Sequence, residues 1–266
     1  MLTETYGTTK PIIAMVHFQP LPGSPLYDRK GGMQKILDLA AKDIEALQKG
    51  GVDCVMFGNE GDRPYLLEAS PVTLAAYSFL VGELKRLLKV PFGVNYLWDP
   101  LATVAVGIAS GARFAREIFT GVYESDMGVW KPNAAAALRL RADCDRADLK
   151  LMFNINAEFA SSLGNRDIAL RAKSAVFSSL ADVILVSGAM TGQSAESSDL
   201  KAVKAALPNT PVMANTGVRI DTVEHILSLA DGCVIGTHFK VDGDTWNAVD
   251  GARVSKFMDK VRSIRK

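Results

Sequence analysis

Eight short apolar runs recur along the whole chain, and stretches with helical spacing of apolar residues separate them. The runs cover residues 11–16, 54–57, 91–94, 114–119, 151–155, 183–186, 212–214 and 233–235. They are nearly continuous rather than alternating, which is typical of parallel strands buried on both faces of a sheet. Regular alternation of strand and helix over about 250 residues favours the α/β class and a closed (β/α)8 TIM barrel.

The segments between the runs carry the signals of surface helices and no sign of a domain boundary. Apolar residues from Ile36 to Leu47 repeat at helical spacing. Asp99 before Pro100 is an N-cap followed by proline at the first helical position. No linker or change of composition interrupts the chain, so we expect one barrel domain over residues 1–266. A doubly wound sheet is the alternative, but its G-x-G-x-x-G fingerprint is absent.

Composition and charge disfavour several classes of partner and location for this chain. With 48% hydrophobic residues, 22% charged residues and a formal net charge of +1, the chain has no basic excess for nucleic acid or an anionic membrane. Neither a signal peptide nor an apolar run of about 18 residues is present. The three cysteines form no C-x-x-C pair. We therefore expect a cytoplasmic protein, and leave open whether it forms a homo-oligomer.

Small and hydroxyl-bearing residues follow the last three predicted strands. Barrels bind ligands at the carboxyl ends of their strands, and commonly hold a phosphate after strands seven and eight. Glycine allows close approach to backbone N–H groups, although these glycines would also suit tight turns. Lys240 would add a cation there, or would be a solvated loop residue. The predicted phosphate-binding residues are Ser187, Gly188, Asn215, Thr216, Gly217, Gly236, Thr237 and Lys240.

Titratable residues near other strand ends are candidates for the chemistry. Arg116 and Glu117 are neighbours in an apolar strand, so one should point into the barrel and the other toward the helices. One of them is functional, or both belong to a structural ion pair. Glu60 and Asp62 would serve acid–base chemistry or a divalent metal, and a plain turn is the better interpretation of Asp62. His17 would titrate near neutral pH or serve as a hydrogen-bonded structural residue.

Asparagines at the ends of strands three, five and seven would make the barrel mouth polar and able to orient hydroxyls or a carbonyl. The predicted catalytic residues are Glu60, Glu117, His17 and Asn154, and the predicted substrate-binding residues are Asn95, Arg116 and Asn156. No strand has a lysine in its middle, which disfavours a Schiff-base aldolase. No hydrolase, nucleotide or zinc motif occurs. A divalent metal such as Mg²⁺ is a candidate cofactor without an assigned ligand set.

Segments spread over nearly the whole chain carry a family resemblance. They are residues 14–23, 50–57 with Asn59 and Glu60, 91–95, 97–100, 116–121, 164–168, 214–218 and Lys240. In these segments the chain resembles the BtpA/SgcQ family, and its SgcQ branch in particular. The resemblance implies a phosphate-binding TIM barrel of the ribulose-phosphate-binding type. Relatives carry an acid where this chain has Gly58, and whether Glu60 replaces that acid is open.

Two functions follow from the residues and the resemblance together. The first is an enzyme, a lyase or isomerase of the aldolase, epimerase or isomerase type, that binds a phosphorylated small molecule at the carboxyl-terminal face of the barrel. The sugar phosphotransferase gene cluster associated with the SgcQ branch implies a sugar phosphate as its substrate. The second is a non-catalytic regulatory or assembly factor that retains the phosphate-binding barrel, as the photosystem I biogenesis role of BtpA-type relatives implies.

Overall fold

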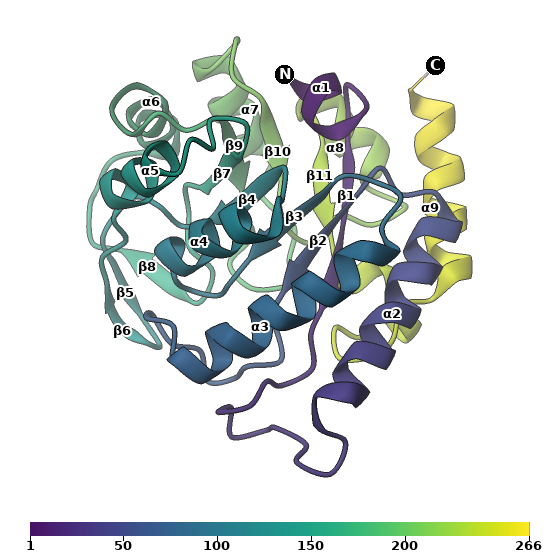
Figure 1. Cartoon of the computed structure of the whole chain (residues 1–266). Coiled ribbons are helices and arrows are strands. Elements are labelled where there is room, and N and C mark those ends of the chain that lie inside the picture. The colour runs from purple at the N-terminus through teal and green to yellow at the C-terminus, as the bar shows by residue number, and fades with distance from the viewer. Residues whose placement is uncertain (266) are drawn as a thin grey trace.

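The eight apolar runs form the strands of one closed parallel barrel in the computed structural model, which describes residues 1–265 (Figure 1). Around the barrel the strands follow the order β1-β11-β10-β9-β7-β4-β3-β2, and neighbouring strands are parallel. The predicted TIM barrel is confirmed. The strands are β1 (Ile12–His17), β2 (Cys54–Gly58), β3 (Phe92–Asn95), β4 (Phe114–Glu117), β7 (Lys150–Asn154), β9 (Val183–Val186), β10 (Val212–Ala214) and β11 (Cys233–Ile235).

Helices surround the barrel, and their ends agree with the capping signals in the sequence (Figure 1). Asp99 accepts hydrogen bonds from the backbone N–H groups of Leu101 and Ala102, with Pro100 at the first helical position, as predicted. No helix within residues 1–265 is long and apolar enough to cross a membrane. The helices are α1 (Leu2–Tyr6), α2 (Gly32–Gly50), α3 (Pro71–Leu84), α4 (Pro100–Ser110), α5 (Ala134–Asp143), α6 (Ile168–Ser179), α7 (Ser197–Ala206), α8 (Val223–Leu229) and α9 (Gly251–Ile264), with 3-10 turns at Lys85–Leu87, Thr237–Phe239 and Val241–Gly243.

The amino-terminal half of the barrel interior is a packed apolar core. Alternate strand residues point inward, and among them Met15, Phe114 and Met152 belong to one buried cluster. Tyr6 of α1 closes the amino-terminal end, since its ring lies 5.1 Å from that of Phe114 and is 1% exposed. A Cβ atom on Gly93 would overlap the Phe114 ring. Only the carboxyl-terminal end of the barrel is left to receive a ligand.

A small antiparallel sheet beside the barrel was not predicted from the sequence. Its strands, in the order β6-β5-β8, are β5 (Tyr123–Ser125), β6 (Gly128–Trp130) and β8 (Ala160–Ser162). Each has only three residues, too few for a recognisable period. Ile118 packs with Tyr123 and Trp130 in the cluster beneath this sheet. Strand β4 therefore ends at Glu117, two residues before the end of the predicted run at Phe119.

Candidate active site at the barrel mouth

A layer of polar side chains lies directly above the apolar interior. Arg116, Asn154 and Asn215 each follow an inward-facing core residue by two positions, so they also point into the barrel. All three are buried, with exposed fractions of 4%, 0% and 3%. Asn95 and Ser187 are buried at the ends of the neighbouring strands. The predicted polar interior is thus present at the end of the barrel where such proteins bind ligands.

Many polar atoms of this layer have no hydrogen-bond partner among the described residues. They are His17 Nδ1, Glu60 Oε2, Asn95 Oδ1, Arg116 Nε, Asn154 Nδ2, Asn154 Oδ1 and Asn215 Oδ1. A buried polar group without a partner costs about 1–3 kcal/mol, and native proteins keep few of them. Their concentration at one end of the barrel indicates a site whose partners come from a bound molecule and water.

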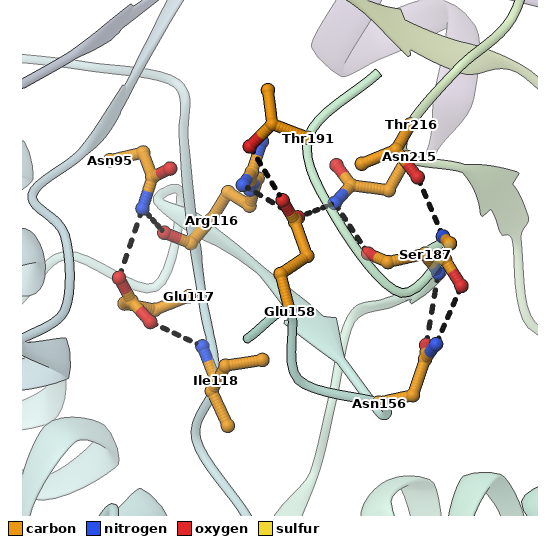
Figure 2. Close-up of polar contacts among 11 residues, drawn as sticks. Asn95, Arg116, Glu117, Ile118, Asn156, Glu158, Ser187, Thr191, Asn215 and Thr216 are labelled. Atoms are coloured by element: carbon orange, nitrogen blue, oxygen red, sulfur yellow. Dashed lines mark hydrogen bonds and ion pairs between the residues drawn. The ribbon is translucent and has the colours of Figure 1, made fainter. Parts of the chain in front are cut away.

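Glu158 connects the two sides of this layer (Figure 2). Its Oε1 lies 3.6 Å from Arg116 Nη2 and 3.5 Å from Asn215 Nδ2, and its Oε2 accepts a hydrogen bond of 3.1 Å from Thr191 Oγ1. The Asn215 amide also donates to Ser187 Oγ at 2.7 Å. Glu158 and Thr191 were not among the predicted site residues. The available signal was an acid placed four residues after the end of a buried strand.

Two titratable groups of the site have strongly shifted pKa values. Burial raises the pKa of Glu60 to about 7; Arg116 opposes this rise and Glu158 adds to it. Burial, with the nearby charges of Lys240 and Arg116, lowers the pKa of His17 well below its ordinary value. Near neutral pH the site therefore contains an uncharged imidazole and a carboxyl group that exchanges its proton readily.

Glu60 lies near Gly58, the position at which relatives carry an acid. Its Oε2 is 3.5 Å from the position that a Cβ atom would take on Gly58. The carboxyl group therefore reaches the space where a side chain at position 58 would begin. Met15 Cε lies nearer still, at 2.9 Å, so Glu60 borders this space from a position two residues further along the chain.

Glu117 was predicted as a catalytic residue, but it does not line the mouth cavity. Its two oxygens accept hydrogen bonds from the Ile118 N–H at 2.5 Å and from Asn95 Nδ2 at 3.0 Å (Figure 2). The neighbouring Arg116 takes the inward position, as the alternation of strand residues requires. Burial raises the pKa of Glu117 well above its ordinary value, and the Ile118 N–H, Arg116 and Asn95 oppose this rise.

Asn156 also differs from its predicted substrate-binding role. Its Nδ2 donates to the Ser187 carbonyl at 2.6 Å, and its Oδ1 accepts from the Ser187 N–H at 2.9 Å (Figure 2). Both ends of the amide therefore fix the backbone at the end of β9. Asn156 therefore positions Ser187 and does not line the mouth cavity.

Five of the eight predicted phosphate-binding residues meet the titratable residues in one cavity of about 30 Å³, and Ser187, Gly188 and Lys240 do not line it. Arg116 of β4 and Glu60 after β2 lie across the mouth from β10 and β11, whereas His17 of β1 lies directly beside Gly236. A Cβ atom on Gly236 would lie 2.8 Å from His17 Cε1, so glycine allows this close approach. The cavity is lined by Met15, His17, Glu60, Arg116, Glu158, Thr191, Gly192, Asn215, Thr216, Gly217, Gly236 and Thr237.

The loop between β9 and α7 covers the phosphate side of this cavity. A Cβ atom on Gly188 or Gly217 would overlap the backbone of Gln193, and one on Gly217 would also overlap Ser194. Gly188 N–H donates to Thr216 Oγ1 at 2.6 Å, and Ser194 Oγ donates to the Gly217 carbonyl at 2.8 Å. With the loop in this position the cavity has room for about one or two water molecules, so a larger ligand requires the loop to move.

Lys240 is neither a solvated loop residue nor a free cation. It is 2% exposed, and its Nζ donates to Asp43 Oδ2 at 2.7 Å. The other oxygen of Asp43 accepts from the Val249 N–H at 2.8 Å. The predicted direct contact between Lys240 and a phosphate is therefore replaced by an internal ion pair that ties α2 to the segment after β11.

Asp62 forms a turn rather than a pair with Glu60. Its Oδ1 accepts from the Leu21 N–H at 2.7 Å and its Oδ2 from Asn59 Nδ2 at 3.2 Å, which joins the loops after β1 and β2. Across residues 1–265, no group of three or more His, Cys, Asp or Glu side chains is arranged to hold a metal ion. Glu60 and Glu158 are the two carboxylates that share the mouth cavity.

Comparisons with known proteins agree with this architecture. A sequence model of the BtpA family matches residues 8–263. The chain is 49% identical to SgcQ, a protein of the sgc region of Escherichia coli, over 100% of this chain and 99% of that one. It is 30% identical to the photosystem I biogenesis protein BtpA of Synechocystis, over 97% of this chain and 90% of that one.

The fold is also similar to solved barrels of distant sequence. A phosphoribosyl anthranilate isomerase from Thermus thermophilus superposes with a TM-score of 0.59 at 10% identity, covering 96% of this chain and 99% of that one. At this identity the similarity concerns the barrel alone.

Proposed function

This chain belongs to the BtpA family, and we propose that it is an enzyme that binds a sugar phosphate at the barrel mouth and moves a proton on it. The observation that carries the proposal is the layer of buried polar atoms without partners among the described residues, beside a carboxyl whose pKa is about 7. In a structural polar network the polar atoms are paired with one another. Here His17, Glu60, Arg116 and Asn215 line the cavity with atoms that have no partner among the described residues.

The phosphate is held on the wall formed after β10 and β11. Thr216 and Thr237 supply hydroxyl groups, and Gly217 and Gly236 let the phosphate oxygens approach the backbone. These residues occupy the positions at which barrels commonly hold a phosphate. The loop from 188 to 196 moves outward to admit the ligand and then covers it, because its backbone otherwise fills the space beside Gly217.

The proton chemistry takes place on the opposite wall. Glu60 removes a proton from the carbon beside the substrate carbonyl and returns it to the same or the neighbouring carbon. Arg116, oriented by Glu158, stabilises the oxyanion that forms in between. The neutral His17 and the amide of Asn154 donate hydrogen bonds to the substrate oxygens. This is the chemistry of an epimerase or isomerase, and of an aldolase that works without a Schiff base.

Thermal unfolding with pentose and hexose phosphates, with and without Mg²⁺, tests this proposal together with a turnover assay on every ligand that stabilises the protein. We expect at least one sugar phosphate to stabilise the wild-type protein and to be converted. Glu60→Gln should keep the stabilisation and lose the turnover. Absence of stabilisation by all sugar phosphates and by inorganic phosphate would refute the proposed site.

A non-catalytic role is the second candidate, because one relative at 30% identity is a photosystem I biogenesis protein. An assembly or regulatory factor would use the same phosphate wall to sense a metabolite. Stabilisation of the wild-type protein by a sugar phosphate, without any turnover at saturating ligand, would favour this role over the enzyme.

A further inference from the structure

A second pocket lies directly outside the mouth cavity and differs from it in size and in its lining residues. It measures about 450 Å³, which is within the range of small-molecule sites. Loops that follow several barrel strands form it, so it is centred over the carboxyl-terminal face of the barrel. Half of its ten lining residues carry aromatic or thioether side chains, and Arg63 and Asp126 add charges. We call this pocket the aromatic vestibule. Its lining includes Arg63, Tyr65, Met127, Phe159, Met190 and Trp246.

Three contacts join the aromatic vestibule to the polar cavity below. Thr191 lines both spaces while its hydroxyl donates to Glu158. Thr237 of the cavity and Thr245 of the vestibule share a hydrogen bond of 2.7 Å between their hydroxyl groups. Tyr65 OH donates to the Glu60 carbonyl at 3.1 Å. The two spaces therefore adjoin through a shared wall, and we call the two together the funnel.

The vestibule exposes large apolar side chains that a folded protein ordinarily covers. Trp246 is 45% exposed and Met190 is 48% exposed. The rings of Tyr65 and Phe159 stand 6.4 Å apart, and the Arg63 guanidinium lies 3.5 Å above the Trp246 ring. Flat rings, a stacked guanidinium and polarisable sulfur atoms together form a surface suited to another flat aromatic group.

We propose that the substrate is a sugar phosphate bearing an aromatic group, and that this group occupies the aromatic vestibule. The inference rests on the proposed function, because the phosphate and the sugar enter the polar cavity once the loop from 188 to 196 moves outward, while the ring lies against Arg63, Tyr65, Phe159 and Trp246, which are outside that loop. A molecule with one anionic, hydroxylated end and one flat apolar end matches the funnel from bottom to top. The cavity beneath can satisfy polar groups, and the vestibule adds aromatic surface beside the charges of Arg63 and Asp126.

Binding measurements with two matched ligands test the proposal. The probes are a hexose phosphate and the nitrophenyl glycoside of the same hexose phosphate, titrated by calorimetry into the whole protein. We expect the aryl compound to bind at least about tenfold more tightly, the gain that one buried aromatic contact supplies. Trp246→Ala and Phe159→Ala should each remove most of this difference and leave the affinity for the plain hexose phosphate unchanged.

Phe177→Ala is the matched control, because Phe177 is 89% exposed on α6 and lines neither space. It should retain the preference for the aryl ligand. Equal affinity for both ligands, or an equal loss of both in Trp246→Ala, would overturn the aromatic substrate while leaving the sugar-phosphate site intact. Failure of both ligands to bind would overturn the inference and the proposed function together. Self-association that Trp246→Ala abolishes would instead assign the vestibule to a second copy of this chain.

Discussion

At the scale of single residues, the raised pKa of Glu60 affects both the proposed proton transfer and the free energy of unfolding. Its carboxyl is 6% exposed and has an oxygen without a partner among the described residues, and burial raises its pKa from 4.5 to about 7. The folded state therefore holds this proton more tightly than the unfolded state does. The free energy of unfolding should fall as the pH rises from about 4.5 to 7, because the unfolded chain loses its proton first.

The first prediction concerns this pH dependence. At about 1.4 kcal/mol per pKa unit, the Glu60 carboxyl should account for roughly 3 kcal/mol of stability lost between pH 4.5 and 7. Glu60→Gln should remove this contribution, so urea unfolding at pH 5 and pH 8 should differ less than in the wild-type protein. Glu68→Gln, which removes an exposed carboxyl of the same loop, is the control and should behave as wild type. Identical pH slopes in all three proteins would contradict the assigned burial.

The second prediction concerns Asn154, whose amide has no partner within the described chain. Asn154→Leu preserves the size of the side chain and removes a buried polar group that costs about 1–3 kcal/mol. We expect an unchanged or higher melting temperature together with loss of sugar-phosphate turnover. Asn156→Leu is the comparison, because it breaks two hydrogen bonds to Ser187 and should destabilise the fold. Equal destabilisation of both variants would make Asn154 a structural residue.

At the scale of elements, strands and caps were predictable because they depend on local pattern. The eight apolar runs became the eight barrel strands, and the cap at Asp99 formed as its sequence indicates. The contacts of Lys240 were not predictable, because Asp43 lies 197 residues earlier in the chain. The inward direction of Arg116 followed from strand alternation once the strand was placed. The role of Asn156 could not be predicted in this way, because its partner is a backbone group at the end of another strand.

The third prediction tests the ion pair between α2 and the segment after β11. The side chains of Lys240 and Asp43 are 2% and 10% exposed. Asp43→Asn leaves the ammonium buried without its counter-charge, and should cost about 3–5 kcal/mol in urea unfolding. The double variant Asp43→Leu with Lys240→Met should recover much of this loss. Asp28→Asn, in an exposed pair with Lys35, should cost much less than Asp43→Asn, because solvent screens the exposed pair. Similar costs for Asp43→Asn and Asp28→Asn would show that the first pair is not held in a buried environment.

At the scale of the whole molecule, the barrel is closed at one end and covered at the other. The amino-terminal end is filled by α1 and the apolar interior. The carboxyl-terminal end holds the polar layer, the loop from 188 to 196 and the aromatic vestibule. Ligand entry therefore depends on the loop, whose backbone lies against Gly217 in the closed arrangement.

The fourth prediction follows from this arrangement. A sugar phosphate bound beside Gly217 displaces the loop outward, and contacts with the ligand should hold it in that new position, so backbone amides from 189 to 195 should exchange hydrogen more slowly with ligand than without it. Hydrogen exchange followed by mass spectrometry measures this directly. Amides of the rim segment from 163 to 167, which lines neither space, serve as the internal control. Unchanged exchange in the loop at saturating ligand would place the ligand elsewhere.

A crystal structure of the protein with the most stabilising sugar phosphate tests the central claim most directly. We expect phosphate density against Thr216, Gly217, Gly236 and Thr237, with the sugar extending toward Glu60 and Asn154. Density for the phosphate outside the barrel mouth, or an empty mouth at saturating ligand, would contradict the account.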